Sequence, residues 1–300
     1  MVFFTFSWAI GLSLVAFGLV IGTIAPTFGI GGGLLAVPIL ILVYNLDGNT
    51  ATATSLGVII FTSMSGTLAY LREKRIDFRI ALSFMVFAIP GATSGAFLAK
   101  FLKDEEIEVD IFQIVFAITM LLISTYKIVT IIINKRKNSN HHNEEIIEKS
   151  SNDSKPWWKQ YKLFRHFSDK RGVEFRYEAK LLPGILIATI GAFLGAMLGL
   201  GGGVIYVPIL TMALGVPVAI AAATSTLTIF AITPISVLIR RASILWDYVF
   251  CIALGTIITS NIVPRFLYKI KSKSILTGFW ILAMGAAIRL LIKVLTGIDV

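Results

Sequence analysis

Long apolar segments separated by short polar loops make up most of this 300-residue chain. A helix needs about 20 apolar residues to cross a bilayer, and the apolar segments mostly reach that length. Two shorter apolar pieces, roughly 34–44 and 204–215, are predicted to be half-helices or the return arms of hairpins. The apolar segments of membrane-spanning length are roughly 6–25, 53–71, 79–101, 109–133, 182–198, 219–240, 247–268 and 275–296. The pattern predicts an all-α integral membrane protein.

Two glycine runs occupy corresponding places in the two halves of the chain. Phe28 to Leu40 reads FGIGGGLLAVPIL, and Leu198 to Leu210 reads LGLGGGVIYVPIL. The same offset repeats the Ala-Thr-Ser at 53–55 as 223–225. We infer a tandem duplication, with a first transmembrane repeat at 1–133 and a second at 181–300. Each repeat is expected to hold three membrane helices and one glycine-broken hairpin or half-helix.

A polar linker, residues 134–180, separates the repeats. Its first part is rich in Lys, Asn, Ser and Glu and is typical of disordered chain. The following stretch, KPWWKQYKLFRHF, mixes aromatic and basic residues, which favours an amphipathic segment lying on lipid head groups. The basic linker and the basic loop at 72–75 are both assigned to the cytoplasm.

The loops also predict that the two repeats are inverted relative to one another. The loop at 103–110 is rich in acids, whereas its counterpart at 265–273 carries Arg and Lys and no acid. Opposite charge at corresponding loops suggests opposite orientations in the membrane. Arg240 and Arg241 go against this scheme, since they would then lie on the outer side.

The amino-acid composition limits the classes of protein to which this chain can belong. The chain is 56% hydrophobic and 15% charged, whereas soluble domains carry about 25% charged residues. The net charge of +10 comes from basic residues at the ends of apolar segments, which suits anionic lipid and not nucleic acid. One cysteine and three histidines in the polar linker exclude a metal or cofactor site built from these residues within the membrane. No nucleophile-and-base set lies in the apolar segments, so we do not expect an enzyme.

The glycine runs are the candidate substrate site. Gly31, Gly32 and Gly33, with Gly201, Gly202 and Gly203, can adopt positive φ and bring backbone N–H groups close to a ligand. A half-helix beginning there has unpaired first amides and a dipole that favours an anion. Such glycines also suit close helix packing. Two runs in register, each followed by Val-Pro-Ile-Leu, favour a binding site.

Polar residues near the runs extend this candidate set. Two roles are open for the Thr-Ser pairs, Thr54 with Ser55 and Thr224 with Ser225. They either cap the next helix or donate hydroxyl hydrogen bonds to an anion, and the sequence does not distinguish these two roles. A second set of residues, two prolines, two aspartates and two arginines, is considered for gating or electrostatic roles. Helix capping is nevertheless favoured for the aspartates, and anchoring at the membrane interface is favoured for the arginines. Each proline leaves a carbonyl free one turn earlier. This second set is Pro38, Pro208, Asp77, Asp247, Arg240 and Arg241.

At the glycine runs, Val37-Pro38, Val207-Pro208 and the two Thr-Ser pairs, the chain resembles the TauE/SafE family of membrane proteins, also called sulfite exporters. The resemblance covers nearly the whole chain apart from the linker. It implies a multi-pass transporter in a prokaryotic plasma (inner) membrane that carries sulfur-containing anions such as sulfite, sulfonates, thiosulfate or sulfoacetate.

We therefore expect a secondary transporter of small anions that works by alternating access around two glycine breaks. The alternatives are a passive anion channel or facilitator and a membrane-embedded assembly or regulatory protein. The expected partners are a small anionic substrate and the lipid bilayer, with no nucleic acid, cofactor or metal. The sequence does not choose between a proton and a sodium ion for coupling, and it is compatible with a homo-oligomer.

Overall fold

A computed structural model describes residues 8–104, 162–168, 170, 172 and 174–266, together with scattered positions in 114–129 and 284–292. The chain divides into two compact units, and each draws on both halves of the sequence. One unit comprises Met1–Val109 with Tyr161–Lys269. The other comprises Asp110–Gln160 with Ile270–Val300, and its described positions are helical. The predicted helices at 109–133 and 275–296 and the linker to residue 161 fall mostly outside the described residues.

The first unit is built from apolar helices, which confirms the all-α class. Within the described residues, four helices are long and apolar enough to cross a membrane. They are α1 (Trp8–Phe28), α3 (Gly48–Arg72), α4 (Phe78–Asp104, with the span ending at Leu102) and α8 (Val218–Arg240, with the span continuing to Ser243). Helices α6 (Leu181–Met197) and α9 (Trp246–Phe266) are further long helices in the described part of the chain.

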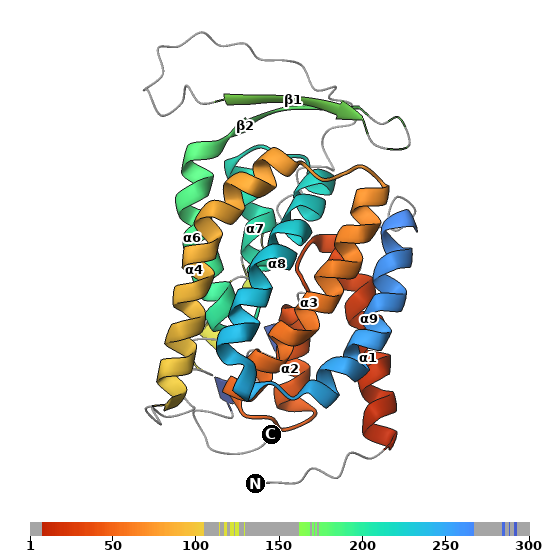
Figure 1. Ribbon diagram of the computed structural model, residues 1–300, viewed down its shortest axis with the longest axis vertical. Helices are drawn as coiled ribbons and strands as arrows, with labels where there is room; N and C mark the ends of the chain where they lie inside the picture. Colours follow the sequence, from red (N-terminus) through yellow and green to blue (C-terminus); the bar gives the residue numbers. More distant parts are fainter. Residues whose placement is uncertain are drawn as a thin grey trace. The chain divides into compact units, whose positions relative to one another are not determined.

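Helices α3 and α8 form the centre of this unit. Both pack against each other, and α3 also packs against α9 and α8 against α4. The pairs α1–α9 and α4–α6 lie at the sides, where Figure 1 shows each pair running alongside. Large apolar side chains on α1, α4 and α9 are exposed, as expected for surfaces that face lipid.

Glycines allow the helices of the pairs α1–α9 and α4–α6 to approach each other closely. A Cβ on Gly18 or Gly22 of α1 would overlap the backbone of α9, and one on Gly91 or Gly95 of α4 would overlap carbonyl oxygens of α6. Small residues allow backbones to approach in this way where lipid offers no hydrophobic drive for association.

Two short helices follow the glycine runs, as predicted. Helix α2 spans Gly33–Leu42 and contains Pro38. Helix α7 spans Gly203–Pro208, and the chain continues as a π-helical segment, Ile209–Ala213. Pro208 cannot donate a backbone hydrogen bond, and the wider π pitch begins at the next residue. The two short arms therefore differ in geometry despite their similar sequences.

A β-hairpin lies in the part of the linker predicted to be an interfacial segment. Strand β1 (Lys162–Ser168) pairs antiparallel with β2 (Glu174–Lys180), in a register from Lys162↔Lys180 to Ser168↔Glu174. The hairpin is attached to the loop between α3 and α4. Lys170 N–H donates to the Glu73 carbonyl over 3.2 Å, and the Tyr177 hydroxyl donates to an Asp77 carboxylate oxygen over 2.7 Å.

Candidate functional site

The glycine runs form two sharp breaks, which we call the first elbow (Gly29–Gly33) and the second elbow (Gly199–Gly203). In the first elbow, Gly31 and Gly32 have φ angles of 82° and 99°. In the second, Gly201 and Gly202 have φ angles of 67° and 77°. Side chains disfavour these left-handed angles, so the glycine requirement is conformational. The predicted breaks with positive φ are confirmed.

The two elbows lie against each other, although they come from different halves of the chain. A Cβ on Gly33 would overlap the Gly199 carbonyl oxygen, and a Cβ on Gly203 would overlap the Gly29 carbonyl oxygen. The contact is therefore backbone against backbone, and no larger residue fits at Gly33 or Gly203. Ile59 of α3 and Ile229 of α8 pack over both elbows.

Several elbow amides have no acceptor. Within residues 8–104 and 174–266, no protein atom accepts a hydrogen bond from the amides of Gly31–Leu34 or of Gly202–Val204. The residues that carry these amides are buried. In contrast, the Leu200 and Gly201 amides both donate to the Gly195 carbonyl. Among the described residues, each short helix thus begins with buried N–H groups that have no acceptor, which gives the two elbows a positive electrostatic character.

The serines of the Thr-Ser pairs hold the opposite elbow. Ser55 Oγ donates to the Gly199 carbonyl over 2.6 Å, and Ser225 Oγ donates to the Gly29 carbonyl over 2.6 Å. Each serine is fully buried and crosses from one half of the chain to the other. In this conformation their hydroxyls therefore fix the elbows and are not offered to a ligand.

The threonines of these pairs bind a loop in the other half of the chain. Thr54 Oγ1 accepts from Leu245 N–H over 3.1 Å, and Thr224 Oγ1 accepts from Asp77 N–H over 3.2 Å. The N-cap interpretation of the Thr-Ser pairs is wrong, because α3 begins at Gly48 behind an Asp47 cap and α8 begins at Val218. Both pairs lie more than a turn inside their helices, where they face the other half.

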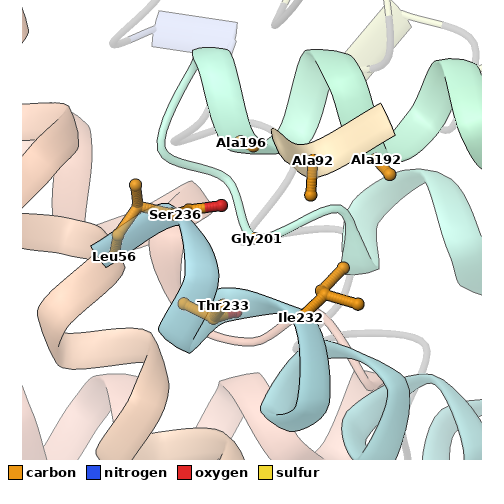
Figure 2. Close-up of a pocket in the computed structure, with 8 residues that line it drawn as sticks. All are labelled: Leu56, Ala92, Ala192, Ala196, Gly201, Ile232, Thr233 and Ser236. Carbon is orange, nitrogen blue, oxygen red and sulfur yellow. The ribbon is translucent and has the colours of Figure 1, made fainter. Parts of the chain in front are cut away.

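A pocket reaches the second elbow. Figure 2 shows it between α4, α6 and α8, with the Ser236 hydroxyl directed toward Gly201. The space inside it is about enough for one water molecule, and part of it is open to the outside. Its lining residues are Leu56, Ala92, Ala192, Ala196, Gly201, Ile232, Thr233 and Ser236. The surface that the pocket presents beside this elbow is apolar and comes mostly from small side chains.

The corresponding positions beside the first elbow are packed together. Gly66 occupies the place of Ser236, Pro26 that of Ala196 and Thr226 that of Leu56. A Cβ on Gly66 would lie 3.1 Å from Thr226 Cγ2 and 3.2 Å from Pro26 Cβ. The two sides of the elbow pair therefore differ, although the repeats have similar sequences.

Arg240 and Arg241 differ in position. Arg240 is 2% exposed, and its guanidinium donates to the Met197 carbonyl, the Asn49 carbonyl and side chain, and Thr52 Oγ1 over 2.8–3.3 Å. This burial does not fit an anchor on the membrane surface. Arg241 is exposed. The place of Arg240 in the first repeat is held by Tyr70, whose hydroxyl donates to the Pro26 carbonyl over 2.6 Å.

The twin aspartates also differ. Asp77 is fully buried, and its carboxylate accepts from the amides of Arg79 and Ile80 as the N-cap of α4, which confirms the capping interpretation. Asp247 is exposed in the first turn of α9. Pro38 and Pro208 are half-buried within the short helices, beyond the elbows.

Sequence reasoning missed three polar residues of this region: Ser236, Asn49 and Tyr206. Ser236 lies one turn before Arg240 on α8, and the helical spacing was the available signal. Tyr206 replaces Ala36 of the first repeat, and this departure from the repeat was its signal. Across the described ranges, His, Cys, Asp and Glu do not gather in groups of three that could hold a metal ion.

Comparison with known proteins shows the family to which the chain belongs. Residues 14–290 match the family model for sulfite exporter TauE/SafE. The chain belongs to the TauE/SafE family. It is 32% identical over 225 residues to the probable membrane transporter protein YunE of Bacillus subtilis, covering 72% of this chain and 73% of that protein. No solved structure matches the chain with significance.

Other relatives carry similar names. A probable membrane transporter protein of Methanocaldococcus jannaschii is 26% identical over 205 residues, covering 67% of this chain and 61% of that protein. A probable membrane transporter protein of Xylella fastidiosa is 36% identical over 84 residues, covering 28% of this chain and 32% of that protein. Family and relatives identify the chain as a membrane transporter.

Proposed function

We propose that this transporter carries small sulfur-containing anions, such as sulfite, sulfonates, thiosulfate or sulfoacetate, across a prokaryotic plasma membrane. One observation carries the proposal: two buried elbows, one from each repeat, meet with helix-start amides that have no acceptor among the described residues. Backbone N–H groups at helix starts stabilise oxyanions without a buried charge. The family name supports sulfur oxyanions as the class of substrate.

In this proposal the glycines and the Thr-Ser pairs have different roles. Amides of Gly31–Gly33 and Gly202–Gly203 bind the anion. Ser55 and Ser225 position the elbows, since each holds the carbonyl of the opposite one. Thr54 and Thr224 connect those serine helices to the loops before α9 and α4. Movement of one half relative to the other would therefore change both elbows together.

Alternating access by two inverted repeats is the proposed mechanism. The pocket leads to Gly201, while the corresponding positions near the first elbow are in contact. Exchange of these two arrangements would open the site to the other side of the membrane. A carrier fits better than an open channel, because Ile59 and Ile229 pack over both elbows. In the proposed coupling step, the anion is transported together with its own proton.

The test is transport in liposomes that contain the purified full-length chain. We expect saturable uptake of radiolabelled sulfite or thiosulfate, with counterflow when the same anion is present inside. Uptake that does not saturate and shows no counterflow would favour a channel. Absence of binding and transport for every sulfur oxyanion, with cations or amines bound instead, would reject the proposal.

A pair of glycine variants tests the elbows in the same assay. Gly32→Ala and Gly202→Ala place a Cβ on left-handed backbone, at φ angles of 99° and 77°. We expect each to reduce transport at least tenfold. Gly172→Ala is the matched control, because Gly172 has a φ of 78° with nothing within 4 Å of an added Cβ. Equal transport by all three variants would remove the elbows from the mechanism.

A further inference from the structure

Tyr206 is a fully buried tyrosine whose hydroxyl has no hydrogen-bond partner among the described residues. Buried tyrosine hydroxyls are nearly always paired. Two other tyrosines in this unit follow the rule. Tyr70 donates to the Pro26 carbonyl, and Tyr177 donates to the Asp77 carboxylate. The Tyr206 hydroxyl therefore needs an explanation outside the contacts of the described residues.

The hydroxyl lies beside the second elbow. A helical side chain leans toward the start of its own helix, and Tyr206 is four residues after Gly202. A Cβ added to Gly202 would lie 2.9 Å from the Tyr206 hydroxyl oxygen and 2.7 Å from its ring carbon Cζ. The same glycine carries one of the unpaired amides. A hydroxyl donor and backbone donors are thus neighbours at this elbow.

Neighbouring residues hold the ring in place. Phe84 of α4 meets it edge to face, with 6.0 Å between the ring centroids. On another side, a Cβ on Gly191 of α6 would lie 3.5 Å from ring carbon Cε1. The ring thus packs against α4 and α6 as well as the elbow, so its hydroxyl has a defined position.

Only the second elbow has this group, since Ala36 takes the corresponding position in the first repeat. The second elbow is also the one that the pocket reaches. Both features therefore belong to the second elbow.

We propose that the Tyr206 hydroxyl donates a hydrogen bond to the oxyanion bound at the second elbow, next to the amides of Gly202 and Gly203. This inference rests on the proposed function and makes Tyr206 a specificity-determining residue. Donors that converge from a hydroxyl and two amides suit an anion with several acceptor oxygens. Sulfite and sulfonates satisfy that condition, whereas a halide offers a single atom.

The test uses Tyr206→Phe in the full-length protein, because phenylalanine keeps the ring and removes only the hydroxyl. Binding of sulfite, methanesulfonate and chloride is measured by calorimetry on the purified protein. We expect at least tenfold weaker binding of sulfite and methanesulfonate. The melting temperature without anion is expected to be unchanged or higher, since no existing bond is lost.

Tyr44→Phe is the control. It removes a hydroxyl that is 2.7 Å from Ser13 Oγ and away from both elbows. We expect its anion affinities to remain within twofold of the unsubstituted protein. Affinities within twofold for Tyr206→Phe as well would overturn the role of Tyr206 and leave the proposed function standing. Failure of the unsubstituted protein to bind any sulfur oxyanion would reject both.

A second measurement does not depend on the stability of the variant. A 3-fluorotyrosine is placed at position 206 by codon suppression, and its fluorine resonance is followed while sulfite is added. We expect a saturable shift that is absent when the label is at position 44. A resonance at position 206 that sulfite does not move would contradict the proposal.

Discussion

Removal of the Ser55 and Ser225 hydroxyls tests whether the two halves are held together at the elbows. Ser55→Ala deletes the donor to the Gly199 carbonyl, and Ser225→Ala deletes the donor to the Gly29 carbonyl. Both serines are fully buried, so water cannot easily replace the lost donor. Alanine also fits the space, which makes the loss of the hydrogen bond the main change.

The expected magnitude follows from the burial of the two carbonyl oxygens. Leaving a buried acceptor without its donor costs about 1–3 kcal/mol. At about 2 kcal/mol, each variant would lower the folding equilibrium constant about 30-fold. Both bonds join the same pair of loops, so the double variant should cost less than the sum of the two.

The assay is reversible unfolding of the purified protein in mixed micelles, with the free energy of unfolding extrapolated to native conditions. Ser94→Ala serves as the control, since Ser94 is exposed on α4 and donates only to carbonyls of its own helix. We expect this control to change stability by no more than about 0.5 kcal/mol. Transport by Ser55→Ala and Ser225→Ala should fall in parallel with the loss in the free energy of unfolding.

The reasoning is refuted if both buried variants are as stable as Ser94→Ala. That result would mean that the serine bonds add nothing to the contact between elbows. Strictly additive losses would instead show that each bond acts separately, which would contradict a shared pair of loops.

Two further predictions concern the surroundings of the site. Arg240→Met removes the donors to Met197, Asn49 and Thr52 and should destabilise the protein by about 1–3 kcal/mol in the same unfolding assay. Exposed Arg241→Met should change stability by less than about 0.5 kcal/mol, and equal losses would contradict a structural role for Arg240. Tyr177→Phe removes the hydroxyl that binds Asp77 and should speed proteolysis within residues 162–180 while sulfite binding is unchanged. Unchanged proteolysis would show that this bond does not retain the hairpin.

The sequence predicted the helices well, since a run of apolar residues long enough to span lipid leaves few alternatives to a helix. The predicted 219–240 became Val218–Arg240, and the predicted 34–44 became Gly33–Leu42. The glycine breaks were equally predictable, because three successive glycines disfavour a helix through local backbone freedom. The start of α3 was missed by several residues, because Asp47 caps a first turn that is polar.

The hairpin at 162–180 was not predicted as strands, because its mixture of basic and aromatic residues suits several structures. Its attachment depends on Tyr177 meeting Asp77, which is 100 positions away in the chain. Propensity within a local window carries no information about such a partner.

What the sequence determined by itself was the duplication, the membrane class and the two flexible breaks, all of which follow from composition and local backbone chemistry. Only the tertiary structure decided which groups meet. Ser55 binds a carbonyl 144 positions away, and Ser225 binds one 196 positions away. Such contacts depend on how the helices pack against one another. The same packing buries Arg240 and places the Tyr206 hydroxyl beside one elbow with no partner among the described residues.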